Sequence, residues 1–214
     1  MILDQIIKVI VSFFGKKAPA ASAPQQPKKL EPKVEQTGQP IDWNNPKSKI
    51  SEHFYVEEAL ELPSWGVLHV PSEDEKKEIE KIAKDVEGAI SILEQILKHR
   101  VSINVHAWMR PEQANCPGSQ WNGKNYNRYI YETQVWKNLS EEEKAKKVEP
   151  KSPHRTGRAI DFHVVGYEGK QKCAEIRQML LPYLEQLNLR MEDISGGWIH
   201  LDNLPVKNKR FFKP

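Results

Sequence analysis

The sequence predicts an α+β domain in which helices pack on one side of a small, mostly antiparallel sheet. Three observations predict this class. A long run of apolar residues at helical spacing follows residue 72, a two-residue alternation comes directly after it, and two more short extended segments lie toward the C-terminal end. The open face of such a sheet is left for a functional site.

The longest helix is expected to begin after Ser72. Ser72 and Glu75, three positions later, form a capping box. The residues that follow recur at steps of three and four, which places them on one helical face: Ile79, Ile82, Ala83, Val86, Ile90, Leu93 and Leu97. We assign this face to the hydrophobic core.

After Arg100 the apolar spacing changes to every second residue, which predicts a half-buried strand with Arg110 on the face of His106. Further strands are expected at 159–165 and 198–201. A second helix lies between them, and Pro182 should kink or restart it. The alternating residues of the first strand are Val101, Ile103, Val105 and Ala107 on one face and Ser102, Asn104, His106 and Trp108 on the other.

Composition divides the chain into three parts. Residues 1–14 are apolar but shorter than the ~20 residues of a membrane-spanning helix. Their apolar side chains form one helical stripe, which favours an amphipathic segment that docks on a partner protein or a membrane surface. Because Asp4 and Lys8 interrupt the apolar run, we find no convincing signal peptide, although the Ala-Ser-Ala at 21–23 leaves a cleaved signal open.

Residues 15–47 are rich in Pro, Ala, Gln and Lys, which predicts a linker. The catalytic domain is expected at 48–214. Within it the stretch 112–150 follows neither the helical nor the strand period, and we interpret it as a long excursion with one short helix capped by Ser140.

Charge and cysteine content exclude several classes of protein. The 32 basic and 29 acidic residues give a net charge of only +3, so we expect no nucleic-acid partner. A mildly basic surface suits an anionic polymer such as a bacterial cell wall. The two cysteines, Cys116 and Cys173, exclude a disulfide-dense scaffold, while a single disulfide between them stays open.

The most informative stretch is Ser-Pro-His-Arg-Thr-Gly-Arg-Ala-Ile-Asp, from Ser152 to Asp161. A zinc hydrolase needs imidazoles and carboxylates that converge on one ion. His154 and Asp161 can meet only across a turn, and Gly157 is where the chain can make it. His200, in a short strand near the C-terminus, is the natural third ligand.

Together these residues resemble the zinc D-Ala-D-Ala peptidases, which share their fold with the hedgehog signalling domain. The resemblance covers about residues 48–205. Its motifs are Ile-Ser-x-His-Phe at 50–54, Arg-Pro-x-x-x-Asn at 110–115, the segment that holds His154 and Asp161, and Trp-x-His at 198–200.

The resemblance implies a zinc (Zn2+) metallopeptidase that hydrolyses peptidoglycan stem peptides as a carboxypeptidase or an L-Ala-D-Glu endopeptidase. His154, Asp161 and His200 would bind the metal, and Arg110 would hold a substrate carboxylate or the developing oxyanion. We also expect His106, Ser152 and Trp198 to line the substrate cleft. Many phage wall hydrolases belong to this family, which indicates an endolysin or virion-borne enzyme, located in a phage virion or at the host cell envelope.

The sequence departs from the family where several members carry a general base, three residues before the last histidine. Here that position is Gly197, so we expect Asp193 as the base, then Glu192, then Asp202. Gly197 also supports an alternative, a non-catalytic structural or binding protein of a virion. His163 remains open as a replacement ligand or a support for the metal site.

Overall fold

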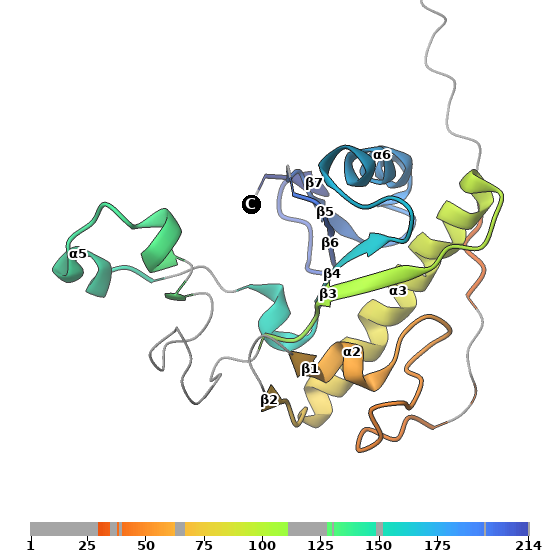
Figure 1. Ribbon diagram of the computed structural model, residues 1–214, viewed down its shortest axis with the longest axis horizontal. Helices are drawn as coiled ribbons and strands as arrows, with labels where there is room; N and C mark the ends of the chain where they lie inside the picture. Colours follow the sequence, from red (N-terminus) through yellow and green to blue (C-terminus); the bar gives the residue numbers. More distant parts are fainter. Residues whose placement is uncertain are drawn as a thin grey trace, which may run out of the picture.

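The structure is a computed structural model and describes residues 30–34, 38, 40–62, 67–110, 128–129, 131–148, 152–194 and 196–213. The predicted N-terminal amphipathic segment at 1–14 and much of the excursion therefore lie outside the described residues. Within them the fold is α+β, as predicted, and its main sheet is open and mostly antiparallel (Figure 1).

The main sheet has five strands in the order β3-β4-β6-β5-β7. All its pairs are antiparallel except β5 with β7. The short strands β1 (Glu61–Leu62) and β2 (Val67–Leu68) form a separate antiparallel pair. The strands of the main sheet are β3 (Ile103–Ala107), β4 (Ala159–Val164), β5 (Arg190–Glu192), β6 (Ile199–Asp202) and β7 (Phe211–Phe212).

The two long helices match the sequence expectations. Helix α3 (Glu73–Leu97) begins with the Ser72–Glu75 capping box. Helix α6 (Lys170–Leu180) gives way to the 3-10 turn η3 (Leu181–Tyr183), which contains Pro182. The short helical elements are α2 (Val56–Leu60), the π-helix η1 (Tyr131–Val135), α5 (Glu141–Ala145) and the 3-10 turn η2 (Pro153–Thr156).

The faces of the sheet differ in polarity, because side chains alternate along each strand. On one face Ile160 pairs with Leu201, and Phe162 pairs with Ile199; all four side chains are buried in the core with the apolar stripe of α3 and with Ile176 of α6. The opposite face carries ionisable groups: Asp161, His163, Arg190, Glu192, His200 and Asp202. Helices therefore cover the apolar face, and the polar face holds the candidate site.

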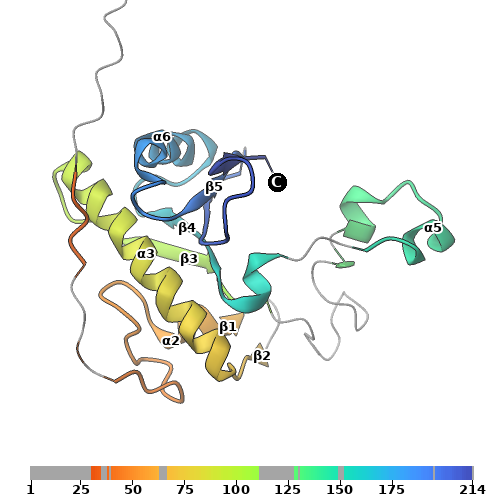
Figure 2. The same cartoon turned by 180° about the vertical axis from the view of Figure 1, so that it is seen from behind.

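Part of the stretch predicted as a linker contacts the domain. Leu30, Ile41 and Trp43 pack against the core. The amide of Gln186 donates to the carbonyl of Leu30 (2.7 Å), and the backbone N–H of Lys33 donates to Ser91 Oγ (2.9 Å) on α3. Residues 30–34 are thereby held along the helix at the back of the sheet (Figure 2).

The excursion carries its predicted short helix at α5, and Ser140 caps it through a capping box with Glu143. Arg128 connects η1 with the end of α5 and the residues that follow it, since it donates to Glu132 and to the carbonyls of Lys144 and Lys147. Figures 1 and 2 both show α5 lying apart from the sheet.

Trp108 corrects one expectation. The two-residue alternation placed it on the exposed face with His106, but its side chain is fully buried. The pairing of β3 with β4 shifts register between Val105 and Ala107, so the alternation does not continue to Trp108. Its ring packs edge-on against Phe54, and its indole N–H donates to the carbonyl of Gly157 (3.0 Å). Trp108 therefore supports the turn that positions His154.

No helix in the described part of the chain is both long and apolar enough to cross a membrane.

Candidate metal centre

The three predicted metal ligands come together on the polar face of the sheet. Asp161 in β4 lies directly opposite His200 in β6. His154 lies in η2, which ends at Gly157 in a left-handed conformation with φ of +74°. A Cβ at Gly157 would also come within 2.7 Å of the Ile79 side chain, so both conformation and space require glycine. This turn brings His154 over the first half of β4.

The distances between the ligand atoms suit one tetrahedral ion. His154 Nε2 lies 3.2 Å from His200 Nδ1 and 3.3 Å from Asp161 Oδ1, and His200 Nδ1 lies 2.7 Å from Asp161 Oδ1. Ligands bound to zinc at 2.0–2.2 Å are ~3.3 Å apart in a tetrahedron. Two of the separations match this value, and the third is a hydrogen bond that a small movement would open.

The environment of His154 leaves its metal-facing nitrogen available. The ring is 2% exposed, and Nδ1 is 2.7 Å from the carbonyl of Trp108, to which it donates. Burial and the positive charge of Arg110 lower the pKa of His154 to about 4. The imidazole is therefore neutral at pH 7, with its proton on Nδ1 and its lone pair on Nε2. A carbonyl that fixes the ring in this way is the usual support of a metal-binding histidine.

His200 is held between carboxylates. Although burial alone lowers its pKa, Asp161 and Asp202 raise it to about 10. Its Nε2 is buried and has no hydrogen-bond partner among the described residues; Asp202 Oδ2 lies 3.4 Å away and Glu192 Oε1 lies 3.9 Å away. A proton and a metal ion would therefore compete for Nδ1, while Nε2 keeps its proton near the two carboxylates.

Asp161 uses its two carboxylate oxygens differently. Oδ1 faces both imidazoles, whereas Oδ2 accepts a hydrogen bond from the Arg110 guanidinium at 2.7 Å. Burial acts to raise the pKa of Asp161, but the nearby His154 and His200 hold it well below the ordinary value. The backbone N–H of Arg110 also donates to the carbonyl of His154 (2.9 Å), which fixes the arginine beside the ligands.

The three carboxylates considered as general bases have different surroundings. Asp202 is fully buried and accepts two hydrogen bonds from Arg190, at 2.7 and 3.0 Å. Asp193 follows β5 and lines a surface hollow with Lys170 and Trp198. Glu192 lies opposite His200 if the register of β5 and β6 is continued by one residue. Burial raises the pKa of Glu192, so its carboxylate takes up a proton at a higher pH than an exposed glutamate does.

The predicted substrate residues lie around the centre. Ser152 Oγ accepts from the backbone N–H of His154 (3.3 Å) and so caps η2. His106 Nε2 contacts His163 Nδ1, and His163 Nε2 lies 3.8 Å from Glu168. Trp198 directly precedes β6 and is 41% exposed. Among the described residues, the group that could hold an ion at this face is His154, Asp161 and His200, without His163.

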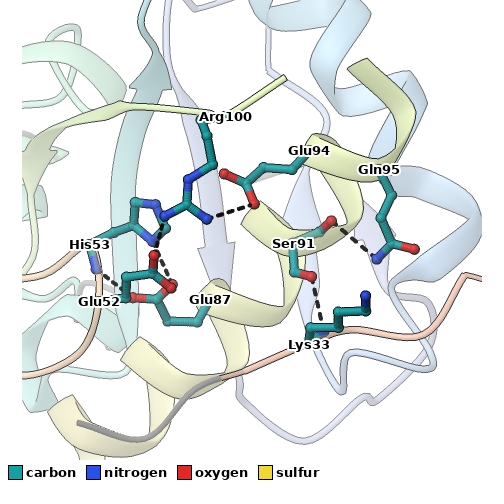
Figure 3. Close-up of a pocket in the computed structure, with 8 residues that line it drawn as sticks. All are labelled: Lys33, Glu52, His53, Glu87, Ser91, Glu94, Gln95 and Arg100. Atoms are coloured by element: carbon teal, nitrogen blue, oxygen red, sulfur yellow. Dashed lines mark hydrogen bonds and ion pairs between the residues drawn. The ribbon is translucent and has the colours of Figure 1, made fainter. Parts of the chain in front are cut away.

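A second cluster of possible ligands, which the sequence analysis did not find, lies where the 51–53 turn meets α3 (Figure 3). Glu87 is 4% exposed and accepts from Ser51 Oγ (2.6 Å), His53 N (2.7 Å) and His53 Nδ1 (2.7 Å). The one signal in the sequence was a glutamate between Val86 and Ile90 of the apolar stripe. His53 is the histidine of the Ile-Ser-x-His-Phe motif at 50–54.

Comparisons of the chain with protein-family models, with curated proteins and with solved structures return no match.

Proposed function

We propose that the protein is a zinc peptidase with a hedgehog/DD-peptidase-like fold that hydrolyses stem peptides of bacterial peptidoglycan. The observation that carries the proposal is the buried group of His154, Asp161 and His200, whose ligand atoms lie within 4.8 Å of one another. The sequence motifs around these residues, which resemble those of the zinc D-Ala-D-Ala peptidases, supply the substrate class. A phage virion or the host cell envelope is the location that this substrate implies.

The donor set fits zinc. Two imidazole nitrogens and one carboxylate oxygen are its usual ligands at hydrolytic sites, where a further position stays open. An ion held there would supply a Lewis acid that polarises a carbonyl and lowers the pKa of water toward ~7. Trp108, through its carbonyl, and Arg110, through Asp161 Oδ2, hold two of the ligands in orientation.

We assign proton transfer to Glu192, in place of the first choice from sequence, Asp193. Glu192 lies opposite His200 when the register of β5 and β6 is continued by one residue, it interacts electrostatically with Asp161 and Arg110 of the same centre, and burial raises its pKa above that of an ordinary glutamate. It would take a proton from the attacking water and return it to the leaving amine. Arg110, which is part-buried beside Asp161, would bind a substrate carboxylate or stabilise the oxyanion.

Zymography on purified peptidoglycan, with and without a chelator, tests the proposal. The wild-type chain should clear the wall only without chelator. His154→Ala should lose both bound zinc and clearing, whereas His99→Ala, a change at an exposed histidine, should keep both. Undiminished clearing by His154→Ala would refute the assignment. No clearing under either condition, together with unchanged masses of the stem peptides, would favour the alternative, a non-catalytic virion protein, for which Gly197 is the supporting observation.

Mass spectrometry of the released muropeptides identifies the bond. New D-Ala termini indicate carboxypeptidase action, and new D-Glu amino termini indicate the endopeptidase. The same digest shows whether the wall itself is the partner of the domain, while residues 1–14 would attach the chain to a virion protein or a membrane surface.

A further inference from the structure

A broad hollow lies at the end of β5 and the start of β6, beside the first residue of α6 and near the C-terminal end of the chain. Its volume is about 890 Å3, within the ~300 to 1,000 Å3 of ordinary ligand sites. The residues that matter for its chemistry are Trp198, Gly196, Gly197, Asp193, Lys170 and Lys213. None of them belongs to the metal-ligand group.

Trp198 provides an aromatic surface in this hollow. Its side chain is 41% exposed, although the strand that it precedes is buried throughout. The ring lies so close to Gly196 that a Cβ there would come within 2.7 Å of it, so the absence of a side chain lets the indole lie flat on the backbone. Arg177, itself 4% exposed, donates to the carbonyl of Trp198 (2.8 Å) and fixes its backbone.

Groups of both charges surround the indole. Lys170 and Lys213 are cationic and Asp193 is anionic, so the rim offers hydrogen-bond donors and acceptors with a small net charge. A second hollow of about 400 Å3 shares Lys170, Asp193 and Ile194 with the first and continues along α6. The two form one groove that is long enough for more than a single ring.

A sugar ring matches this combination. Its C–H groups form an apolar face that can lie on an indole, and its edge carries neutral hydroxyl and amide groups that bind carboxylates and ammonium ions. The apolar lining of the hollow, together with donors and acceptors at its rim, offers both kinds of contact.

The position of the groove connects it with the metal centre. Trp198 is two residues before His200, so their Cα atoms are at most roughly 7 Å apart. Asp193 directly follows Glu192. The groove therefore lies at the ends of the two strands that carry Glu192 and His200.

We propose that this groove binds sugar rings of the glycan strand to which the stem peptide is attached, with Trp198 as the stacking platform. The inference rests on the proposed function, because it assigns the non-reacting part of the same substrate to a surface beside the same site. Binding energy from this part would hold the wall polymer while the stem peptide enters the centre.

The test measures binding of the full chain to soluble glycan strands from which an amidase has removed the stem peptides. Trp198→Ala should weaken binding about tenfold, and Trp198→Phe should recover most of it, since an aromatic face remains. Trp136→Ala, which removes a part-exposed ring of the excursion, is the matched control and should bind as the wild type. Circular dichroism confirms that each variant is folded.

His154→Ala separates the two proposals, because glycan binding needs no hydrolysis. We expect it to bind glycan strands as tightly as the wild type. Wild-type affinity in Trp198→Ala, or an equal loss in Trp136→Ala, would overturn the groove assignment. If the wild type hydrolyses the wall but does not bind glycan strands, the groove assignment fails and the peptidase proposal stands. If it binds glycan strands but does not hydrolyse the wall, the peptidase proposal fails and the groove assignment stands.

Discussion

The described part of the chain holds two clusters of histidine and carboxylate groups whose ligand atoms lie within 4.8 Å of one another: His154, Asp161 and His200, and Glu52, His53 and Glu87. By spacing alone they are equivalent, but their hydrogen bonds differ. In the first cluster the Nδ1 proton of His154 points away from the group, to a carbonyl, and Nε2 faces the other ligands. In the second, His53 Nδ1 faces Glu87 directly.

The hydrogen bond between His53 and Glu87 changes what the second cluster does. The hydrogen bond to Glu87 raises the pKa of His53, although burial opposes it. Burial likewise acts to raise the pKa of Glu87, but His53 and Ser51 lower it overall. The two residues form an ion pair, and Arg100 adds a second cation by pairing with Glu52 (Figure 3). The first cluster also holds such a pair, between His200 and Asp161, and it differs from the second in the neutral His154, whose Nε2 faces the other two ligand atoms. We infer that this imidazole, rather than ligand spacing, distinguishes the candidate metal site from a structural ion pair.

The largest expected difference between the clusters is in zinc affinity. Asp161→Asn should raise the zinc Kd on the order of a thousandfold, because a protein ligand carries ~4 kcal/mol of a typical binding free energy. Glu87→Gln, the same chemical change in the other cluster, should leave the Kd and the stoichiometry of one unchanged. Competition with a chromophoric chelator measures both. Two bound ions in the wild type, one of which Glu87→Gln removes, would contradict the distinction.

A smaller difference, in kcat, is expected between changes at Arg110, beside the first cluster, and at Arg100, beside the second. Arg110→Ala should lower kcat about a hundredfold on peptidoglycan while zinc remains bound, because it removes a cation beside the reacting group. Arg100→Ala should leave kcat unchanged and alter the free energy of unfolding by no more than ~1 kcal/mol, since the Arg100 side chain is 75% exposed. If Arg110→Ala left kcat unchanged, as Arg100→Ala is expected to do, Arg110 would act only on stability.

The candidate metal ligands were predictable because their positions depend on local sequence. Gly157 predicts the turn between His154 and Asp161, and the alternation of β4 and β6 predicts which side chains share a face. Glu87 was harder to interpret. The groups that donate hydrogen bonds to it come from the 51–53 turn, far away in the chain, so the sequence shows only a charge within an apolar stripe.

Long-range pairing explains the remaining differences. Strands β5 and β7 contain three and two residues, too few to show a period. The pairing of β5 with β6, continued by one residue, brings Glu192 rather than Asp193 opposite His200. Trp108 was misplaced because the register shift in β3 depends on its partner strand. The two-residue alternation predicts which face of the sheet a side chain lies on only as far as the regular strand continues. The sequence alone does not show where the regular strand ends.

The smallest expected effect is the pH dependence that the second cluster contributes to stability. The folded-state pKa of His53 lies above its ordinary value of 6.5, so its stabilisation is complete below that pH and is lost as the pH rises through the folded-state pKa. The pKa of Glu87 lies below its ordinary value of 4.5, so its stabilisation is present above that pH and is lost on acidification. The pair should therefore stabilise the fold most between these two values.

Urea unfolding of the wild type and of Glu87→Gln, both free of metal, measures this contribution. The difference in free energy of unfolding should be larger at about pH 5.5 than at about pH 9, because the stabilisation from the charged His53 decreases as the pH rises through its folded-state pKa. Titration of His154 and His200 occurs in both proteins and cancels in the difference. An equal difference at the two pH values would mean that Glu87 stabilises the turn through Ser51 and the His53 backbone, without the charge of the imidazole.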